Sequence, residues 1–159
     1  PVRDVQSRIL KSGGYLLPYL DLKPGERYFE AIQKIGVTGI IKGKGMNKGW
    51  ENQTWFFADS LITRSDLKEG LSEVYNIVKE EPDGSKNVTL DWLVTILSEI
   101  GGGTSQEIYY LLDREKNFLA IASDKRDTEL TRAQVAAIID RVLNPFGKEI
   151  DHFGNFINQ

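Results

Sequence analysis

Two arginines follow a threonine in two copies of one short phrase. Residues 61–67 read Leu-Ile-Thr-Arg-Ser-Asp-Leu, and residues 129–135 read Glu-Leu-Thr-Arg-Ala-Gln-Val. A threonine just before an apolar-periodic run is a typical helix N-cap, which places Arg64 and Arg132 in the first turn of a helix. Free backbone amides at a helix start, together with a guanidinium, could bind an anion.

The same two arginines have a second interpretation. A cation at the positive end of a helix dipole is mildly unfavourable, so another group must compensate for it. That group is either an anionic ligand, or the carbonyl groups or a carboxylate of a neighbouring repeat. Residues used twice at the joints of a repeat array usually hold the array together, and this favours the second interpretation of Arg64 and Arg132.

Residues 42–60 contain further groups suited to an acidic sugar. Lys42 and Lys44 are cations, and Trp50 stands among asparagines and a glutamine. An aromatic ring beside amide groups can stack on a sugar face. The run Trp-Phe-Phe at 55–57 favours burial instead, because three large aromatic side chains cannot all face water cheaply. The candidate anion-binding or glycan-binding residues are Arg64, Arg132, Lys42, Lys44 and Trp50, with Trp50 favoured as the surface platform.

The sequence assigns no catalytic, cofactor-binding or metal-binding residues. Cysteine is absent, which excludes disulfides and thiolate sites, and His152 is the single histidine. No spacing of carboxylates fixes a catalytic pair. The glycines between residues 39 and 49 miss both the phosphate-loop and the dinucleotide spacings. Residues 113–117 begin like a calcium loop, but Phe118 replaces the required glycine.

The elements that would position the candidate residues are mostly helices. Both copies of the phrase continue with the same apolar stripe, as expected for two copies of one helical unit. Thr89 opens a third helix with a similar stripe, but Leu90 stands where the other two have arginine. The third start is therefore a looser member of the repeat.

Local signals predict the remaining elements. Gly13 and Gly14 end a short amphipathic helix, and Gly36 stops the next helix. Residues 42–60 have no sustained period and predict a long, ordered loop. The predicted helices lie at about 5–12, 28–36, 63–78, 89–100, from 104 onward and at 131–143, with a short strand or extended loop at 118–122.

Composition limits the class of protein. The chain has 159 residues, of which 40% are hydrophobic, enough for one domain or a tight array of small units. A net charge of -3 without a basic stripe excludes nucleic acid as a favoured partner. No apolar run could span a bilayer, and no signal peptide is visible. The first residue is Pro1 rather than methionine, so we expect a piece of a longer protein whose export signal could lie upstream.

The order of these features resembles the surface-layer homology repeat. A helix with Ala31 and Ile32 is followed by the turn Gly39-Ile40-Ile41-Lys42-Gly43, a loop, and then Ile-Thr-Arg-Ser-Asp at 62–66. The second copy keeps Leu-Thr-Arg-Ala at 130–133 but has Gln134 in place of the acid and no Gly-Ile-Ile turn before it. The resemblance implies binding of acidic cell-wall glycans through this region.

The whole chain is similar to the C-terminal region of FAD-dependent oxidoreductases from Bacteroides-type bacteria. The similarity covers residues 5–14 near the start and, near the end, Asn-Pro-Phe at 144–146 and residues 150–156. It implies that any FAD is held by another domain and that the catalytic domain of the same polypeptide is the partner. The resemblances also imply a periplasmic or extracellular location.

Together these observations predict a mainly α fold, with surface-layer-homology-like helix-loop-helix repeats in a small helical bundle. The predicted organisation is a single accessory domain over 1–159. It divides into an N-terminal helix and linker (1–24), a first repeat unit (25–79), a second, divergent part (80–146) and a tail (147–159). The expected function is non-catalytic packing against the catalytic domain. The alternative is a module that binds carbohydrate or cell-envelope glycan.

Overall fold

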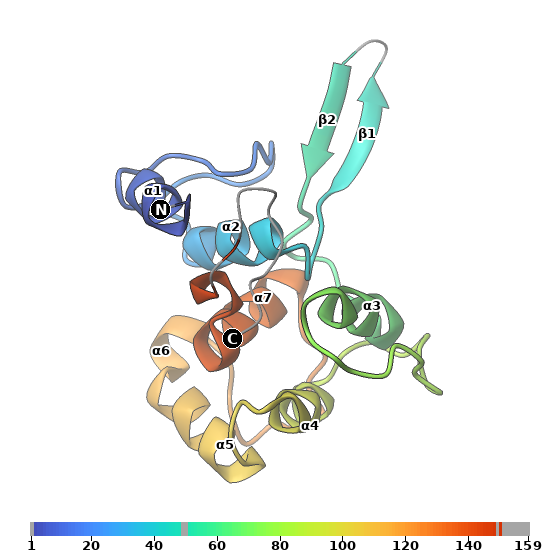
Figure 1. Cartoon of the computed structure of the whole chain (residues 1–159). Helices are drawn as coiled ribbons and strands as arrows, with labels where there is room; N and C mark the ends of the chain where they lie inside the picture. The colour runs from blue at the N-terminus through green and yellow to red at the C-terminus, as the bar shows by residue number, and fades with distance from the viewer. Residues whose placement is uncertain (1, 49–50, 149, 151–159) are drawn as a thin grey trace.

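The computed structural model describes residues 2–48, 51–148 and 150. Within these residues the fold is mainly α-helical, as predicted, with one small antiparallel hairpin (Figure 1). The elements are α1 (Val2–Lys11), α2 (Phe29–Thr38), β1 (Lys44–Lys48), β2 (Glu51–Trp55), α3 (Arg64–Val74), α4 (Leu90–Ile100), α5 (Ser105–Arg114), α6 (Lys116–Leu119), α7 (Arg132–Leu143) and the 3-10 helix η1 (Pro145–Gly147).

The backbone segments that lead into α3, α4 and α7 pair with one another in a closed ring. Isolated antiparallel bridges join Leu61 to Thr131, Thr63 to Asn87 and Thr89 to Glu129. The first amide of each helix donates to a carbonyl of the next segment. These hydrogen bonds are Arg64 N to Lys86 O (2.9 Å), Leu90 N to Thr128 O (3.0 Å) and Arg132 N to Ser60 O (2.8 Å).

The second amide of each helix repeats this pattern. Ser65, Asp91 and Ala133 donate to the carbonyls of Gly84, Arg126 and Ala58, at 3.0, 2.8 and 3.0 Å. The next amide is bonded by the capping threonine of its own helix. Asp66 N donates to Thr63, Trp92 N to Thr89 and Gln134 N to Thr131. The three starts are therefore equivalent, and the Thr89 start is a full member despite Leu90.

The apolar side chains of the three starts build the centre of the core. Each residue just before a capping threonine is buried, and these are Ile62, Val88 and Leu130. The residues four and eight places after each threonine are fully buried, and these are Leu67, Leu71, Leu93, Leu97, Val135 and Ile139. The same helical stripe thus faces the same interior from three directions, which predicts cooperative packing.

Outer elements cover this centre unequally. Helix α2 packs along α7, and α5 packs against α4. Beside α3 lies the non-helical segment 75–87, held by Lys68, whose Nζ donates to the Glu80 carbonyl (3.0 Å) and pairs with Glu81 (3.3 Å). Helices α7 and α4 are thus each flanked by another helix, and α3 by the non-helical segment 75–87.

The prediction of a loop over residues 42–60 was wrong. Strands β1 and β2 pair in antiparallel register from Lys44 with Trp55 to Lys48 with Glu51. The hairpin projects from the helical body (Figure 1). A strand shows alternating hydrophobicity when one of its faces is buried, and a projecting hairpin lacks that signal. Its base is attached to a distant segment by a parallel bridge between Thr54 and Tyr19.

Three predicted boundaries were also wrong. Gly36 does not end its helix; it lies inside α2, where a Cβ would come within 2.5 Å of the Tyr19 hydroxyl oxygen, and the helix ends at the left-handed Gly39. Helix α3 ends at Val74, because Tyr75 is extended and leaves Val78 in solvent. Of residues 118–122, predicted as a short strand or extended loop, the first two lie in α6 (Lys116–Leu119), and residues 120–122 lie outside any helix or strand.

We predict that the centre of the ring is the most sensitive part of the core. Leu130→Ala removes a fully buried side chain and should lower the free energy of unfolding by about 3 kcal/mol in urea denaturation. Leu61→Ala is the matched control, because Leu61 belongs to the ring but its side chain is 44% exposed, and it should cost less than about 1 kcal/mol. Equal losses in the two variants would contradict a core centred on the ring.

Candidate functional site

A groove of about 340 Å³ lies between α3 and the turn that follows α2. It brings together three of the five candidate residues, Lys42, Lys44 and Arg132. Three carboxylate side chains, from Asp66, Glu69 and Glu73, line the same groove. Its three cations are therefore matched by three anions.

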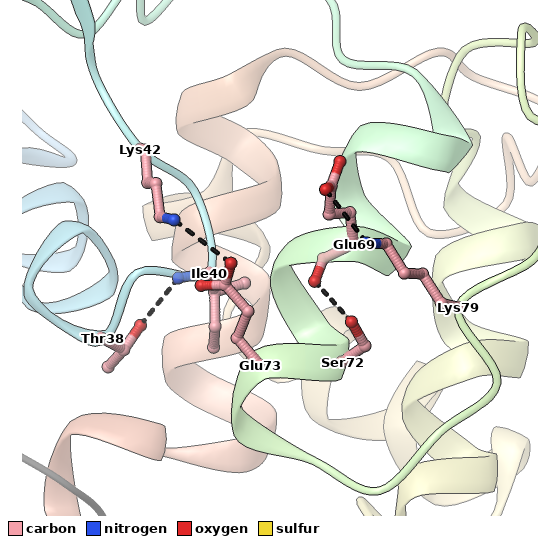
Figure 2. A network of polar contacts seen from close by, with 7 residues as sticks. All are labelled: Thr38, Ile40, Lys42, Glu69, Ser72, Glu73 and Lys79. Atoms are coloured by element: carbon pink, nitrogen blue, oxygen red, sulfur yellow. Dashed lines mark hydrogen bonds and ion pairs between the residues drawn. The ribbon is translucent and has the colours of Figure 1, made fainter.

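Two of these carboxylates form ion pairs with lysines (Figure 2). Lys42 Nζ lies 3.2 Å from Glu73 Oε1, and Lys79 Nζ lies 3.2 Å from Glu69 Oε1. Both pairs are more than 45% exposed, so each contributes little to stability. The Lys42–Glu73 pair reduces the positive potential that a polyanionic ligand would need, whereas Lys79 neutralises one of the groove's anions. The groove presents both cations and anions rather than a basic surface.

The turn that forms one wall of the groove is held rigidly against α3. Thr38 Oγ1 donates to the Ile35 carbonyl (2.6 Å) and accepts from Ile40 N (3.3 Å), a contact drawn in Figure 2. The Ile40 carbonyl lies so close to Gly70 that a Cβ there would be 1.8 Å from its oxygen. Gly70 thus permits the contact between the turn and α3.

Arg132 is buried and bonded to the backbone. Its Nε donates to the Phe56 carbonyl at 2.8 Å, and its Nη2 donates to the Lys42 carbonyl. The guanidinium carbon lies 4.9 Å from the centre of the Phe56 ring. Burial lowers the pKa of Arg132, while nearby Tyr19, Asp66 and Asp21 act to raise it. Arg132 therefore joins the start of α7 to both ends of the hairpin.

Arg64 is placed apart from the groove. Its Nε donates to the Asn87 carbonyl at 3.2 Å, and its guanidinium carbon lies 5.5 Å from the centre of the Trp92 ring. Trp92 occupies in α4 the place that Asp66 occupies in α3, three residues after the capping threonine. The two repeated arginines therefore make related contacts with successive units of the ring and do not converge on one ligand.

The amides that anion binding would require are already bonded. At the starts of α3 and α7, the first two amides donate to carbonyls of the neighbouring segment and the third donates to the capping threonine. An anion at either helix start would have to break these bonds.

The aromatic candidates divide between the core and the hairpin. Phe56 is fully buried, while Trp55 and Phe57 are half-buried and stack at 6.3 Å between ring centres. Trp50 lies outside the described residues, as does His152. The prediction that Trp50 is a surface platform for a sugar therefore stays a prediction.

Sequence reasoning missed two polar side chains that organise this region. The Asp21 carboxylate accepts hydrogen bonds from the Phe56 and Phe57 amides, at 2.9 and 2.7 Å, where Phe57 has a left-handed φ of 58°. The fully buried Gln33 accepts from the amides of Leu16 and Leu17, both at 2.7 Å. A lone polar residue in an apolar helical stripe, as at Gln33, was the available signal.

A second cavity of about 440 Å³ lies between the end of α1, α2 and α7. Asp140 of α7 lines it, near Lys34, which pairs with Glu30 at 2.9 Å. Burial raises the pKa of Asp140, while Lys34 and Arg141 act in the opposite direction. The effect of desolvation on the pKa of this carboxylate is larger than the opposite effect of the nearby cations.

In the part of the chain that the structure describes, no group of three histidine, aspartate or glutamate side chains is arranged to hold a metal ion. No helix among the same residues is long and apolar enough to cross a membrane.

Comparison of the chain with protein-family models, with curated proteins and with solved structures gives no significant match.

We predict that the two repeated arginines differ strongly in their contribution to stability. Arg132→Ala leaves two carbonyl groups without their donor in a buried position and should lower the free energy of unfolding by about 3 kcal/mol. Arg64→Ala is the matched control; it removes one hydrogen bond at a half-buried position and should cost about 1 kcal/mol. Chemical denaturation measures both, and a larger loss for Arg64→Ala would contradict these roles.

We also predict that Asp140 reduces stability at neutral pH. Burial raises its pKa in the folded chain, so the folded state holds the proton more tightly than the unfolded state. The free energy of unfolding therefore falls as pH rises from the pKa of Asp140 in the unfolded chain through its raised pKa in the folded chain. Asp140→Asn should exceed the original chain in urea midpoint at neutral pH, and the difference should shrink as pH falls toward about 4. Asp124→Asn, at an exposed position, should show no such gain, and a lower midpoint for Asp140→Asn at neutral pH would refute the prediction.

Proposed function

We propose that this chain is a non-catalytic accessory domain of an FAD-dependent oxidoreductase, built from surface-layer-homology-like helix-loop-helix repeats. Its role is to pack against and position the catalytic domain of the same polypeptide, which would hold any FAD. The observation that carries the proposal is the closed ring of three helix starts. The ring uses the repeated arginines and the helix amides for internal hydrogen bonds.

The repeat interpretation is supported by equivalent turns in two units. Helices α2 and α6 both end at a left-handed residue, Gly39 with φ of 82° and Ala120 with φ of 52°. Each is followed by a buried isoleucine, Ile40 or Ile121. Each turn then leads through a connection to a capped helix start. The first unit comprises α2 and α3 and the last comprises α5, α6 and α7, while α4 contributes a helix start between them.

The architectural role is supported by the way polar groups are used. Arg132, Asp21 and Gln33 are the strongly engaged polar side chains, and each bonds to backbone of another segment. Groups held in this way have fixed orientation and little freedom to exchange partners with a substrate. These contacts join the N-terminal linker, the hairpin and the ring, as expected for a domain whose role is structural.

A glycan-binding module is the second candidate, because one observation favours it. The groove beside α3 gathers Lys42, Lys44 and Arg132 within one surface feature. An acidic envelope glycan there would have to displace Glu73 from Lys42 and approach Asp66. Like charges so placed oppose a polyanion, which is why we rank this function below the architectural one.

The test of the accessory function is the chemistry of the purified chain. We expect the 159-residue chain to bind no FAD in calorimetry and to show no flavin-dependent turnover, while the parent protein carries a flavin spectrum. FAD binding or turnover by the isolated chain would refute the proposal.

The second candidate is tested by titrating the chain with acidic envelope glycans. We expect no saturable heat, and Lys44→Ala should behave as the original chain does. Binding that Lys44→Ala abolishes and that Lys86→Ala retains would establish the glycan-binding function instead, because Lys86 lies outside the groove.

A further inference from the structure

The larger cavity, between the end of α1, α2 and α7, contains a carboxylate that the fold does not use. Asp140 of α7 lines this cavity of about 440 Å³ and is half-buried. Its carboxylate makes no hydrogen bond or ion pair with another residue in the described part of the chain. A partly desolvated carboxylate lowers stability unless a donor or a cation compensates for it. The gain in stability expected for Asp140→Asn expresses this cost, and a ligand that carries a positive charge would offset it.

Two guanidinium groups line the same cavity without an acidic partner. Arg27, exposed in the turn before α2, has no hydrogen bond, ion pair or ring contact with another described residue. The guanidinium carbon of Arg141 lies 4.6 Å from the centre of the Phe118 ring, and no described carboxylate forms an ion pair with it. A guanidinium that stacks on a ring keeps the N–H groups in its plane for a carboxylate. The cavity therefore holds unpaired groups of both signs.

The other charged side chains of the cavity already have partners. Glu30 pairs with Lys34 at 2.9 Å, one turn apart on α2. Glu26 Oε1 accepts a hydrogen bond from the backbone amide of Lys23 at 3.0 Å. The charged groups that remain for a ligand are thus one carboxylate and two guanidiniums.

Apolar side chains form much of the remaining wall. Leu10 of α1 and Phe29 and Ala31 of α2 are buried, and each lines the cavity. Sites for small molecules combine such apolar walls with a few polar groups, in volumes of roughly 300–1,000 Å³. The size and lining of this cavity are therefore those of a site for a small, partly apolar molecule.

We propose that this cavity binds a small apolar zwitterion, a free α-amino acid or a short peptide, with its ammonium group on Asp140 and its carboxylate on Arg27 and Arg141. A purely anionic ligand would be repelled by Asp140, and a purely cationic one by both guanidiniums. A zwitterion makes charge-assisted hydrogen bonds to both signs. Its apolar side chain packs against Leu10 and Phe29. The inference is independent of the architectural role, because the site uses no residue of the ring.

Calorimetric titration of the 159-residue chain tests the proposal with three probes, namely L-leucine, L-phenylalanine and the dipeptide leucyl-leucine. At least one probe should bind saturably with a dissociation constant below about 1 mM. Tighter binding of leucyl-leucine than of L-leucine identifies peptides as the source of the zwitterion, and the reverse order identifies free amino acids. The absence of saturable binding for all three probes would overturn the proposal.

Two analogues of the tightest probe separate its two charges. The N-acetylated form lacks the ammonium group, and the C-terminal amide lacks the carboxylate. Each analogue should bind at least about tenfold more weakly than its parent probe, because each leaves one of the charged groups of the cavity without its partner. An analogue that binds as tightly as the probe would refute a zwitterion site.

Substitution of the carboxylate tests its contact with the ligand. Asp140→Asn removes the charge at nearly constant shape and should weaken binding of the tightest probe at least about tenfold. Asp124→Asn, at an exposed position outside the cavity, should leave binding unchanged. The urea midpoint of Asp140→Asn shows that the variant is folded, so weaker binding is not a loss of structure. Unchanged binding by Asp140→Asn would contradict the proposal.

The guanidinium contacts are tested in the same way. Arg27→Gln and Arg141→Gln should each weaken binding of the probe by about threefold or more, and they should have little effect on the amidated analogue. Arg114→Gln is the matched control, because Arg114 stacks on Tyr110 at 5.9 Å outside the cavity. Equal binding by all three variants and the original chain would remove the arginines from the site and overturn the zwitterion assignment.

Discussion

Backbone hydrogen bonds among three helix starts are the interaction on which the other parts of this fold depend. The carbonyls of each start accept two hydrogen bonds from the amides of one neighbour, and its own first two amides donate to carbonyls of the other, so no start is complete without both partners. The same contacts hold Ile62, Val88 and Leu130 in the interior. A chain built in this way satisfies its helix ends internally. It also unites segments that are distant in sequence into one cooperative core.

This constraint explains the positions of the candidate functional residues. Because the start of α7 bonds to the carbonyls of Ala58 and Ser60, Arg132 is carried beneath the base of the hairpin, where it binds the backbone of Phe56 and Lys42. Arg64 is carried by the same geometry to the next start, over Trp92. The groove beside α3 is then a consequence of the joint between two units, and three of its charged side chains, Lys42, Glu69 and Glu73, form ion pairs within the chain.

Local signals allowed the ring to be predicted in part. The repeated Thr-Arg phrase and the buried stripes follow from capping and helical period, which operate over a few residues. The sequence predicts that the Thr89 start is a looser member because Leu90 replaces arginine, yet the contacts of the ring are made by backbone amides, which every residue except proline has. The hairpin was not predictable because a projecting hairpin shows no alternating hydrophobicity. The Asp21 and Gln33 contacts were not predictable because their partners lie 16 or more residues away.

The most direct measurement of the ring is native-state hydrogen exchange at the first amides of α3, α4 and α7. The amides of Arg64, Leu90 and Arg132 lie in three different helices but share one closed set of hydrogen bonds. If the ring holds the fold together, all three should exchange only through global unfolding, with the same free energy and the same dependence on denaturant. Exchange of one of these amides at a clearly lower free energy than the other two would show that its helix start opens separately, and would contradict a closed ring.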